Sequence, residues 1–503
     1  MVQIELLYND KIINNILNNR GITLKDLEIP KQETDYVFKN TEQGIEQFIN
    51  NMLGNKNIAV LFDADVDGLY AGKIITEYIR SAGMNCSIYM NEDKSHGLNK
   101  EIMNWCLTER VDYLIIVDAG TNDEKFHDLF IEKGISLLIL DHHDINIKEV
   151  MIPKKERVVI NCKQDKSPNT ELSGAGVVYK FIRQLDKKLG VGGTEKYKKW
   201  VGITVLSDSC NILNKENRYF VNNLFKEYEN DMLFSKFKNY GSINNMFNFK
   251  IIPLLNACMR MAEINLVFDL VFTSTSKTLD TLLVHAEKVQ TKQKEEVDKA
   301  LQSLKMLVGK NFVFSRVDDE NTRKSIIGLI ANKIREKYNK ASIVVRKDGR
   351  DYKGSFRGID NIDNEILKDL GIKVEGHKKA CGVEIKEEQF KEVVKTLLHK
   401  KIEREDGVVY DYELLEGDYI DKKRTLNRIA FLNEWVGNGF DKVRIKIIMT
   451  MAEPDLVKYE KVKRYRHIYF EVVDFDVENN TRYGSELIAY PCLKGDSFTL
   501  VKD

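Results

Sequence analysis

The chain has 503 residues, 43% of them hydrophobic, and its 77 basic side chains balance 77 acidic ones to a formal net charge of zero. A chain of this length is too long to fold around a single hydrophobic core, so about three domains are expected. No stretch approaches the roughly 20 apolar residues of a membrane span, and the opening residues lack a signal-peptide pattern. Seven scattered cysteines without a C-x-x-C pair argue against a zinc site or a disulfide framework. We therefore expect a cytoplasmic protein with no membrane association.

The first third of the chain has the pattern of an α/β domain. Residues 1–55 are expected to be mainly helical and to form a lead-in to the first domain. From 56 to 162, short apolar segments alternate with amphipathic ones, as strands alternate with helices. This pattern predicts a doubly wound parallel sheet with ligands at the carboxyl ends of its strands. The expected strands are 58–62, 86–90, 113–117, 135–140 and 157–161, and the expected helices are 69–82, 99–109 and 123–133.

An acidic stretch, VLFDADVDGLYAG, follows the first expected strand. It places Asp63, Asp65 and Asp67 at alternate positions, ahead of Gly68 and an amphipathic segment. Three carboxylates this close repel one another unless a positive charge lies among them. Hard oxygen ligands suit Mg²⁺ or Mn²⁺. An acidic helix N-cap would explain the same residues without a metal.

Two further strands end in polar residues of the same kind. The strand 113–117 runs into Asp118, and the strand 135–140 runs into Asp141, His142 and His143. Parallel strands bring these ends to one edge of the sheet, so three clusters of carboxylates or imidazoles would meet there. The three clusters together predict a divalent-metal centre.

The rest of the chain changes character twice. A long charged segment, 275–306, carries apolar residues mostly on one face and predicts a connecting helix. Residues 307–400 return to mixed α/β patterning. Beyond residue 400, the runs IKIIMTM, HIYFEVVDF and SELIAY have the period of two that is typical of strands in a small β barrel or sandwich. Strands of the middle part are expected near 311–315, 342–346, 351–356 and 381–385.

Several short motifs of the chain resemble those of a known protein family. DADVDG, VDAGTN and DHH, in this order and spacing, resemble the motifs of the DHH phosphoesterase superfamily, and VGITVLSDSCNILNKENRYFV resembles its next helical motif. Within the superfamily the chain is most similar to the RecJ family, single-strand-specific 5′→3′ exonucleases. That likeness rests on IPLLNACMRMAEINLVFDLVF, KSIIGLIANKIREKYNKASIVV, KGSFRG, EGHKKACGVEI and WVGNGFDKVRIKI.

The resemblance implies an architecture. It consists of a doubly wound α/β DHH domain, a long connecting helix, a second α/β DHH-associated domain and a C-terminal OB-like β domain. The expected boundaries are 1–55 for a helical lead-in, 56–250 for the DHH catalytic domain, 251–306 for the connecting helical segment, 307–400 for the substrate-binding DHH-associated domain and 401–503 for the OB-like nucleic-acid-binding domain.

The resemblance also assigns roles around the metal. It implies two ions, Mn²⁺ or Mg²⁺, and the imidazole among the ligands favours Mn²⁺. We expect Asp141 to orient a neighbouring imidazole and His143 to bind the phosphate or protonate the departing oxygen. The division of roles between His142 and His143 comes from the family alone. The implied metal ligands are Asp63, Asp65, Asp67, Asp118, His142 and Asp208.

The second domain supplies the expected substrate contacts. Ser355 and Arg357 alternate on one strand, so both can face a phosphate, although a basic edge strand is the structural alternative. Lys333 stands where RecJ proteins more often carry Arg, and His96 stands where an aromatic residue is expected. The remaining residues assigned to substrate binding are Asn256, Arg260, Gly376 and His377.

A basic and aromatic stretch in the C-terminal part, KYEKVKRYRHIYF, suits a single strand of nucleic acid, because basic residues follow the backbone and aromatic residues stack on bases. Solubility of a surface strand is the alternative explanation. The residues assigned to this contact are Lys463, Arg464, Tyr465 and Arg466.

Together these features predict a metal-dependent exonuclease that digests single-stranded DNA from its 5′ end, releasing nucleoside 5′-monophosphates through water activated by two metal ions. The alternative is a phosphodiesterase for short oligonucleotides or cyclic dinucleotides, which would have little use for the C-terminal β domain. A third possibility, a scaffold without catalysis, conflicts with the intact set of metal ligands. We expect a monomer, with a helicase or a single-strand-binding protein as a partner.

Overall fold

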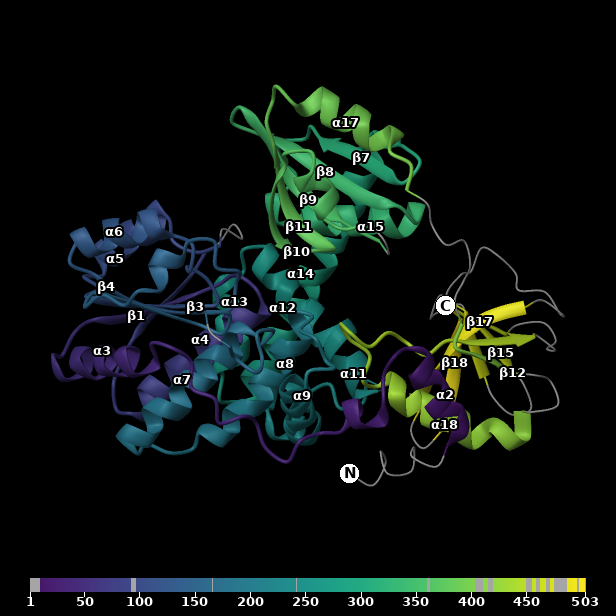
Figure 1. Cartoon of the computed structure of the whole chain (residues 1–503), viewed down its shortest axis with the longest axis horizontal. Coiled ribbons are helices and arrows are strands. Elements are labelled where there is room, and N and C mark those ends of the chain that lie inside the picture. Colours follow the sequence, from purple (N-terminus) through teal and green to yellow (C-terminus); the bar gives the residue numbers. More distant parts are fainter. Residues whose placement is uncertain are drawn as a thin grey trace.

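The structure is a computed structural model of the whole chain. The residues it describes are 10–91, 96–164, 166–240, 242–359, 362–402, 410–414, 419–448, 455–457, 462–466, 471–474, 486–494 and 497–502. Three β-sheets organise them, one in each of three bodies (Figure 1). The predicted order of an α/β domain, a connecting helix, a second α/β domain and a C-terminal β domain is confirmed.

The first sheet is parallel and has five strands. Its order is β2-β1-β3-β4-β5, so the direction of winding reverses between β1 and β3. In doubly wound sheets, ligands bind at the carboxyl ends of strands beside such a reversal. The strands lie close to the predicted positions and are β1 (Ile58–Phe62), β2 (Ser87–Met90), β3 (Tyr113–Val117), β4 (Ser136–Asp141) and β5 (Arg157–Asn161).

Helices cover both faces of this sheet. Val60 and Phe62 of β1 pack toward one helical layer, and their neighbours Ala59 and Leu61 pack toward the other. Because successive side chains of a strand point to opposite faces, a strand covered on both sides must be apolar throughout. The first layer contains α3 (Thr41–Leu53), α4 (Val66–Ser81) and α7 (Gly174–Leu189), and the second contains α5 (Lys100–Thr108) and α6 (Glu124–Glu132).

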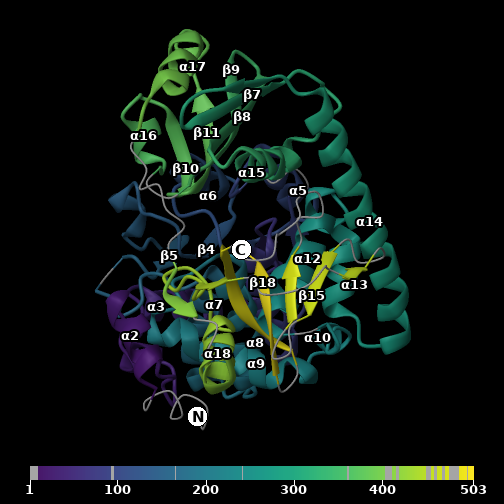
Figure 2. The ribbon, with the colours of Figure 1, turned by 90° about the vertical axis from the view of Figure 1, so that its right-hand side faces the viewer.

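A helical region follows the sheet and ends in one long helix, α14 (Ser276–Ser303), which rises toward the second domain (Figure 2). Leu279, Leu283 and Ala286 of α14 pack on the first core, whereas Val297 and Ala300 pack on the second domain. None of the helices in the described ranges is long and apolar enough to cross a membrane. The other helices here are α8 (Lys198–Ser207), α9 (Lys215–Glu227), α10 (Met232–Ser235), α11 (Ile243–Asn245), a π-helix (Met246–Ile251), α12 (Ile252–Arg260) and α13 (Ile264–Phe272).

The second domain is a six-stranded mixed sheet in the order β10-β11-β9-β8-β7-β6. One helix, α15 (Ile327–Tyr338), packs on one face, and α16 (Glu365–Lys368) and α17 (Phe390–His399) pack on the other. The four strands predicted here are confirmed, and β6 and β10 are additional. The strands are β6 (Met306–Val308), β7 (Phe312–Val317), β8 (Ala341–Asp348), β9 (Asp351–Arg357), β10 (Lys373–His377) and β11 (Ala380–Ile385).

The C-terminal domain is a β domain with one long helix, α18 (Tyr419–Asn433). Its seven strands follow the order β12-β13-β17-β18-β16-β15-β14. The helix packs on this sheet, and its buried residues include Leu426 and Ile429. The strands are β12 (Tyr412–Leu414), β13 (Ile445–Ile448), β14 (Asp455–Val457), β15 (Val462–Arg466), β16 (Glu471–Asp474), β17 (Glu486–Lys494) and β18 (Ser497–Lys502).

The first described helix, α2 (Lys11–Asn19), belongs to the core of this C-terminal domain. Ile13, Ile16 and Leu17 are buried there together with residues of α18 and the last sheet. Asp10 caps α2 and also accepts hydrogen bonds from Arg428 Nη1 at 2.8 Å and Thr425 Oγ1 at 3.1 Å. The helical pattern of the sequence gave no sign of this partner, because amphipathicity identifies a buried face but not the surface that covers it.

Candidate metal centre

The acidic turn after β1 depends on a glycine. Asp63 is 2% exposed, and a Cβ at Gly68 would lie 2.5 Å from the Asp63 carbonyl oxygen and 2.6 Å from its Cβ. Only a residue without a side chain allows the first turn of α4 to approach Asp63 this closely. Asp65 is the N-cap of α4, because its Oδ1 accepts from the N–H groups of Asp67 at 2.9 Å and Gly68 at 3.1 Å. The capping interpretation is therefore correct for Asp65, and its second carboxylate oxygen stays available to a cation.

Asp67 is held by the start of another helix. Its two oxygens accept from the N–H groups of Gly174 at 2.7 Å and Ala175 at 2.8 Å, in the first turn of α7. Helix N-termini favour anions in this way. The pKa of Asp67 is nevertheless raised well above its usual value, first by burial and then by the charges of Asp208 and Asp65. A cation among these three carboxylates would remove that repulsion.

Asp118 occupies a strained backbone position at the end of β3. Its φ of 60° is in the left-handed region, which non-glycine residues adopt at a cost of about 1–3 kcal/mol. A Cβ at Gly174 would overlap the Asp118 carboxylate, so this glycine provides room for it. Burial, followed by the charges of Asp67, Asp65, Asp63 and Asp208, raises the pKa of Asp118.

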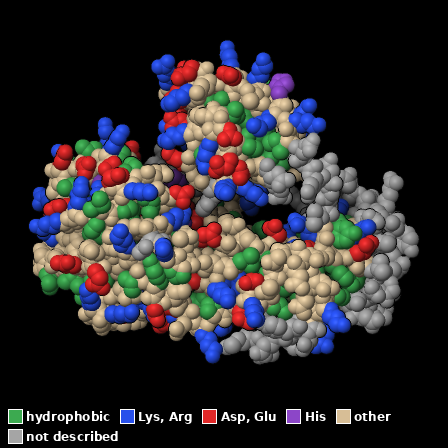
Figure 3. Space-filling view, in the orientation of Figure 1, with side chains coloured by type: hydrophobic (Ala, Val, Ile, Leu, Met, Phe, Trp, Pro, Cys, Tyr) green, Lys and Arg blue, Asp and Glu red, His purple; other side chains and the backbone are tan. Residues whose placement is uncertain are grey.

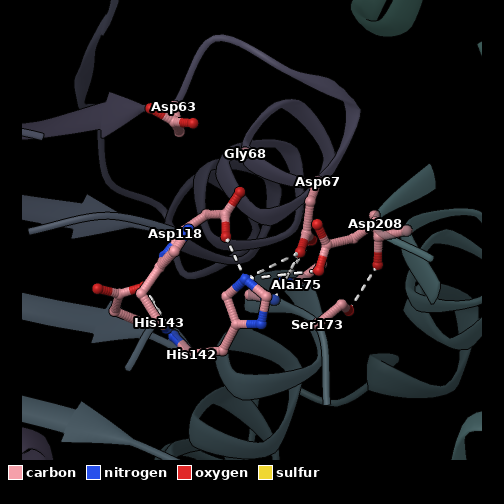
Figure 4. Close-up of polar contacts among 12 residues, drawn as sticks. Asp63, Asp67, Gly68, Asp118, His142, His143, Ser173, Ala175 and Asp208 are labelled. Atoms are coloured by element: carbon pink, nitrogen blue, oxygen red, sulfur yellow. Dashed lines mark hydrogen bonds and ion pairs between the residues drawn. The ribbon is translucent and has the colours of Figure 1, made fainter. Parts of the chain in front are cut away.

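His142 lies at the centre of the acidic groups (Figure 4). Its Nδ1 is 2.9 Å from the Leu172 carbonyl oxygen, which can only accept, so Nδ1 carries the proton. The opposite nitrogen, Nε2, is 3.1 Å from Asp118 Oδ1, 3.7 Å from Asp208 Oδ2 and 3.9 Å from Asp67 Oδ2. A neutral imidazole fixed in this tautomer presents an Nε2 lone pair, which is the form that binds metal.

Asp141 holds His143 and the turn after β4. Its Oδ1 accepts from His143 Nδ1 at 2.8 Å and from the N–H of His142 at 2.7 Å, and its Oδ2 accepts from the N–H of Thr121 at 3.0 Å. Burial alone would raise the pKa of Asp141, but His143 and these donors hold it below its usual value. The His143 side chain is 49% exposed, so it is accessible from outside the fold.

The acidic groups form two clusters, which a third group of Asp118, His142 and His143 joins by sharing one residue with each. Asp67, His142 and Asp208 can each offer a ligand atom within 4.8 Å of the others, and so can Asp63, Asp65 and Asp118. Asp118 Oδ1 lies 3.1 Å from His142 Nε2, so it links the two clusters. The structure therefore brings together all six residues predicted as metal ligands, in an arrangement that could hold two ions.

The donor set fits Mn²⁺ or Mg²⁺. Five carboxylates and one imidazole are hard or borderline ligands, as these ions prefer. The Oδ1 atom of Asp63 is buried and has no hydrogen-bond partner among the described residues. Buried polar atoms are normally satisfied, so this oxygen fits a bound cation.

The metal is therefore expected to stabilise the fold. Adding Mn²⁺ to metal-free protein should raise the melting temperature in thermal denaturation, and EDTA should reverse the rise. The pKa values of Asp67 and Asp118 are raised in the metal-free fold. Protons therefore stabilise that fold at low pH and compete with the ion, so the metal-induced rise should grow as the pH increases. A melting temperature indifferent to Mn²⁺ at every pH would contradict the metal centre.

His96 is a site residue whose role the sequence did not reveal. Its Nδ1 lies 2.7 Å from Asp63 Oδ2, although the sequence marked His96 only as a departure from the RecJ pattern. The two residues are far apart in the chain and meet because β2 is the neighbour of β1. A histidine in a loop after a strand of an α/β sheet is the only sequence signal for this contact.

A basic cavity of about 290 Å³ adjoins the metal centre on the side of His96. Arg260 from α12 and Arg357 from β9 both line it, together with Ser355. Burial, and then the like charge of Arg357, lowers the pKa of Arg260 to about 10, whereas Asp65 opposes this shift. Two partly buried guanidinium groups side by side favour an anion between them, and a phosphate has the matching geometry.

Ser355 and Arg357 face the same way, as predicted. Arg357 Nη1 donates to Ser355 Oγ at 2.7 Å and to the Phe356 carbonyl oxygen at 2.8 Å. A Cβ at Gly328, in the first turn of α15, would come 2.6 Å from Arg357 Nη2. The glycine thus lets the helix N-terminus approach the guanidinium, and both groups favour an anion.

Of the side chains that the structure describes, those of the other predicted substrate residues do not line the basic cavity. Asn256 lies one helical turn before Arg260 on α12. Lys333 is not among the residues lining the basic cavity, and its Nζ pairs instead with Asp298 of α14 at 2.8 Å. Gly376, with a φ of 118°, and His377 end β10, and strand register places His377 opposite Ala380, which is itself opposite Arg357. The side chain of His377 lies outside the described residues.

The predicted nucleic-acid stretch of β15 needs a correction. Tyr465 is 2% exposed and packs in the C-terminal core, so it cannot stack on a base. Successive residues of a strand face opposite sides, and position 465 falls on the buried side. Arg464 pairs with Glu471 of the neighbouring strand at 3.2 Å. The side chains of Lys463 and Arg466 lie outside the described residues, as do residues 458–461 and 467–470.

Comparisons with known proteins agree with this geometry. The DHH family, N-terminal domain, matches residues 57–204, and the DHHA1 domain matches residues 309–402. A putative prophage-derived single-strand DNA-specific exonuclease of Bacillus subtilis, YorK, is 28% identical over 440 residues, which cover 78% of this chain and 75% of YorK. The single-stranded-DNA-specific exonuclease RecJ of Haemophilus influenzae is 21% identical over 396 residues, with 70% and 68% of the two chains covered.

A solved structure shows the same fold. RecJ of Thermus thermophilus, crystallised with Mn²⁺, matches with a TM-score of 0.74 at 16% identity, over 97% of this chain and 74% of that one. The two matched domains occur in the order of the first and second sheets, with α14 between them. The chain therefore has a DHH-family N-terminal domain followed by a DHHA1 domain, and it is similar to RecJ exonucleases over most of its length.

Proposed function

We propose that the protein is a divalent-metal-dependent exonuclease that hydrolyses single-stranded DNA from the 5′ end and releases nucleoside 5′-monophosphates. The observation that carries the proposal is the position of the basic cavity beside the metal centre. Arg260 and Arg357 line this cavity together with His96, whose Nδ1 lies 2.7 Å from Asp63 Oδ2. A terminal phosphate held by Arg260 and Arg357 would place a neighbouring phosphodiester near the clustered carboxylates. The single-strand-specific names of the relatives support the choice of substrate.

The ligands to the cations would be Asp63, Asp65, Asp67, Asp118, His142 and Asp208. Divalent ions at such a site acidify water and neutralise phosphate charge. The donor set favours Mn²⁺, with Mg²⁺ as the alternative, and the two clusters, joined through Asp118 and His142, support two ions.

The chain's own groups complete the reaction. Asp141 keeps the His143 imidazole oriented toward the substrate side, where it can hold a non-bridging phosphate oxygen or give a proton to the departing 3′ oxygen. Burial lowers the pKa of His143, but the larger combined influence of Asp141, Asp63 and Asp208 raises it to about 10 in the metal-free protein. Leu172 fixes the tautomer of His142 through its carbonyl group.

A surface feature supports a long substrate. Figure 3 shows that the molecule is hollowed where the DHHA1 domain, the DHH domain and the C-terminal domain meet. A strand could lie along such a surface, whereas a dinucleotide would need only the basic cavity. We further propose that the protein is a cytoplasmic monomer, in keeping with seven free cysteines, and that it acts with a helicase or a single-strand-binding protein.

The test uses one single-stranded oligonucleotide labelled at its 5′ end or at its 3′ end, with Mn²⁺. We expect immediate release of a labelled mononucleotide from the first and a descending ladder from the second. Release of a labelled mononucleotide from the 3′-labelled strand, with a ladder from the 5′-labelled strand, would show digestion from the 3′ end. Hydrolysis of dinucleotides or cyclic dinucleotides with an intact oligonucleotide would assign the protein to the small-substrate branch.

Arg357→Ala should raise the KM for a 5′-phosphorylated strand by roughly 10- to 150-fold, because a charged hydrogen bond contributes about 1.5–3 kcal/mol. The KM for a 5′-hydroxyl strand should change much less. Arg357→Lys should recover only part of the loss, since an amine cannot bind two oxygens in a fork. The control is Lys347→Ala, an exposed residue of β8 that pairs with Glu387. An equal loss on both substrates would contradict phosphate recognition by Arg357.

A further inference from the structure

A second cavity adjoins the metal centre and differs from the basic cavity in chemistry. It has a volume of about 300 Å³ and lies between the end of α8, residues 244–249, and the C-terminal domain. We call it the amide cavity, because asparagine side chains are the commonest polar groups in its lining. These asparagines include Asn244, Asn245, Asn248 and Asn438. Its volume is at the lower end of the range of about 300–1,000 Å³ that is typical of ligand clefts.

The two cavities flank opposite ends of the metal cluster. Asp63 contacts His96, which lines the basic cavity. Asp208 is contacted by Cys210, whose Sγ lies 3.7 Å from Asp208 Oδ2 and which lines the amide cavity. Figure 4 shows Asp63 and Asp208 on opposite sides of His142. A strand with its terminal nucleotide at the basic cavity and a phosphodiester at the metal ligands would therefore continue toward the amide cavity.

The lining of the amide cavity includes an aromatic side chain that the fold does not bury. Phe249 is 65% exposed, on the π-helix. Contact with a ligand in the cavity could bury this ring, and burial of a phenylalanine stabilises by about 1.5–3 kcal/mol. Irregular π-helical turns are also frequent at functional sites. Tyr490 lines the same cavity, with Lys442 Nζ 3.9 Å from the centre of its ring.

The polar groups of the amide cavity suit an uncharged ligand that both donates and accepts hydrogen bonds. An asparagine amide offers donors and acceptors together, as the edge of a nucleobase does. The lining contains one carboxyl group, Glu434, which interacts with the Ser242 hydroxyl and the Asn244 N–H. An amide-lined pocket with a flat aromatic wall resembles a base-binding site more than a phosphate-binding one.

We propose that the amide cavity receives one unstacked nucleobase of the single strand, a fixed number of nucleotides from the end being digested. The base stacks on Phe249 and meets the asparagine amides with its edge. This inference rests on the proposed exonuclease function and adds a contact to it. It also gives a reason for single-strand specificity that does not depend on the metal centre, because a base paired in a duplex cannot enter the cavity.

The experiment scans single-stranded oligonucleotides that each lack one base, at successive positions from the digested end. For the unmodified enzyme, kcat/KM for the first cleavage should fall by about 5- to 150-fold at one position, as expected for the loss of one stacked base. For Phe249→Ala, kcat/KM on the intact strand should fall by a similar factor, and base removal at that position should cost nothing more. Phe249→Trp should restore the positional dependence.

Tyr240→Ala is the matched control, since Tyr240 is an exposed aromatic residue of the same region that does not line the amide cavity. The Tyr240→Ala variant should show the same fall in kcat/KM as the unmodified enzyme when the base at the sensitive position is removed. A profile without a sensitive position, or the same penalty in Phe249→Ala as in the unmodified enzyme, would overturn the base pocket and leave the exonuclease proposal standing. An enzyme that cuts none of these strands would overturn both.

Discussion

Asp118→Asn is expected to lower kcat for single-strand cleavage by at least about 10³-fold, because it removes the carboxylate that links the two metal clusters. The substitution removes the charge and leaves the size and the backbone conformation of the residue nearly unchanged. Asparagine has the same shape as aspartate and tolerates a φ of 60° better than most residues. Four other carboxylates raise the pKa of Asp118 after burial does, so a neutral amide should relieve repulsion in the metal-free protein.

The melting temperature separates the two effects of Asp118→Asn. The metal-free variant should melt at or above the temperature of the metal-free parent, while the rise caused by Mn²⁺ should be much smaller. Asp144→Asn is the control, since Asp144 is an exposed acid two residues after His142 whose carboxylate pairs with Lys163. A variant that keeps its kcat and its response to Mn²⁺ would show that Asp118 is not a metal ligand.

Gly68→Ala is expected to destabilise the DHH domain and to lower kcat by about 10²-fold, although no reacting group is changed. In an ordinary helix, alanine in place of glycine stabilises by up to about 1 kcal/mol. Here the new Cβ would lie 2.5 Å from the Asp63 carbonyl oxygen, and overpacking of that kind costs about 1–3 kcal/mol. The overlap is with backbone, which cannot move aside as a side chain can, so the cost should exceed the gain.

The loss of activity in Gly68→Ala follows from the displacement of Asp63. A shift of about 1 Å in a catalytic group can cost about 10²-fold in rate. Gly44→Ala provides the control, because that helical glycine lies under the same sheet and its Cβ would meet only side-chain atoms, the nearest being Ile160 Cδ1 at 2.8 Å. Gly44→Ala should lower the melting temperature without lowering kcat. Equal kcat losses in the two variants would indicate a general effect of destabilisation.

Much of the DHH domain could be predicted from the sequence because local signals and the fold agree. Each buried strand is a short apolar run, and Asp118 and Asp141 follow such runs directly, so their meeting at one edge follows from parallel pairing. The contact between His96 and Asp63 could not be predicted in the same way, since it depends on the path of a loop. The pairing of Lys333 with Asp298 likewise depends on which face of α15 meets α14.

The error at Tyr465 has a different cause. Alternation along a short strand shows that two sets of residues face opposite ways, but not which set faces the core. In KRYR, the basic residues suggested an exposed strand, and the aromatic residue among them was assigned to the same surface. The structure places Tyr465 among the buried residues of the C-terminal domain. A basic and aromatic mixture is therefore a weak signal unless the buried face is known independently.

The position of α2 has a consequence for the order of events during synthesis. Asp10 and Arg428, which pair across the C-terminal domain, are 418 positions apart in the chain. At elongation rates of about 5–20 residues per second, a ribosome needs roughly 20–80 s to travel between them. The apolar face of α2 must therefore stay uncovered until the C-terminal domain is made. The DHH and DHHA1 domains are synthesised in the meantime, so we expect the C-terminal core to close around α2 after both have been made.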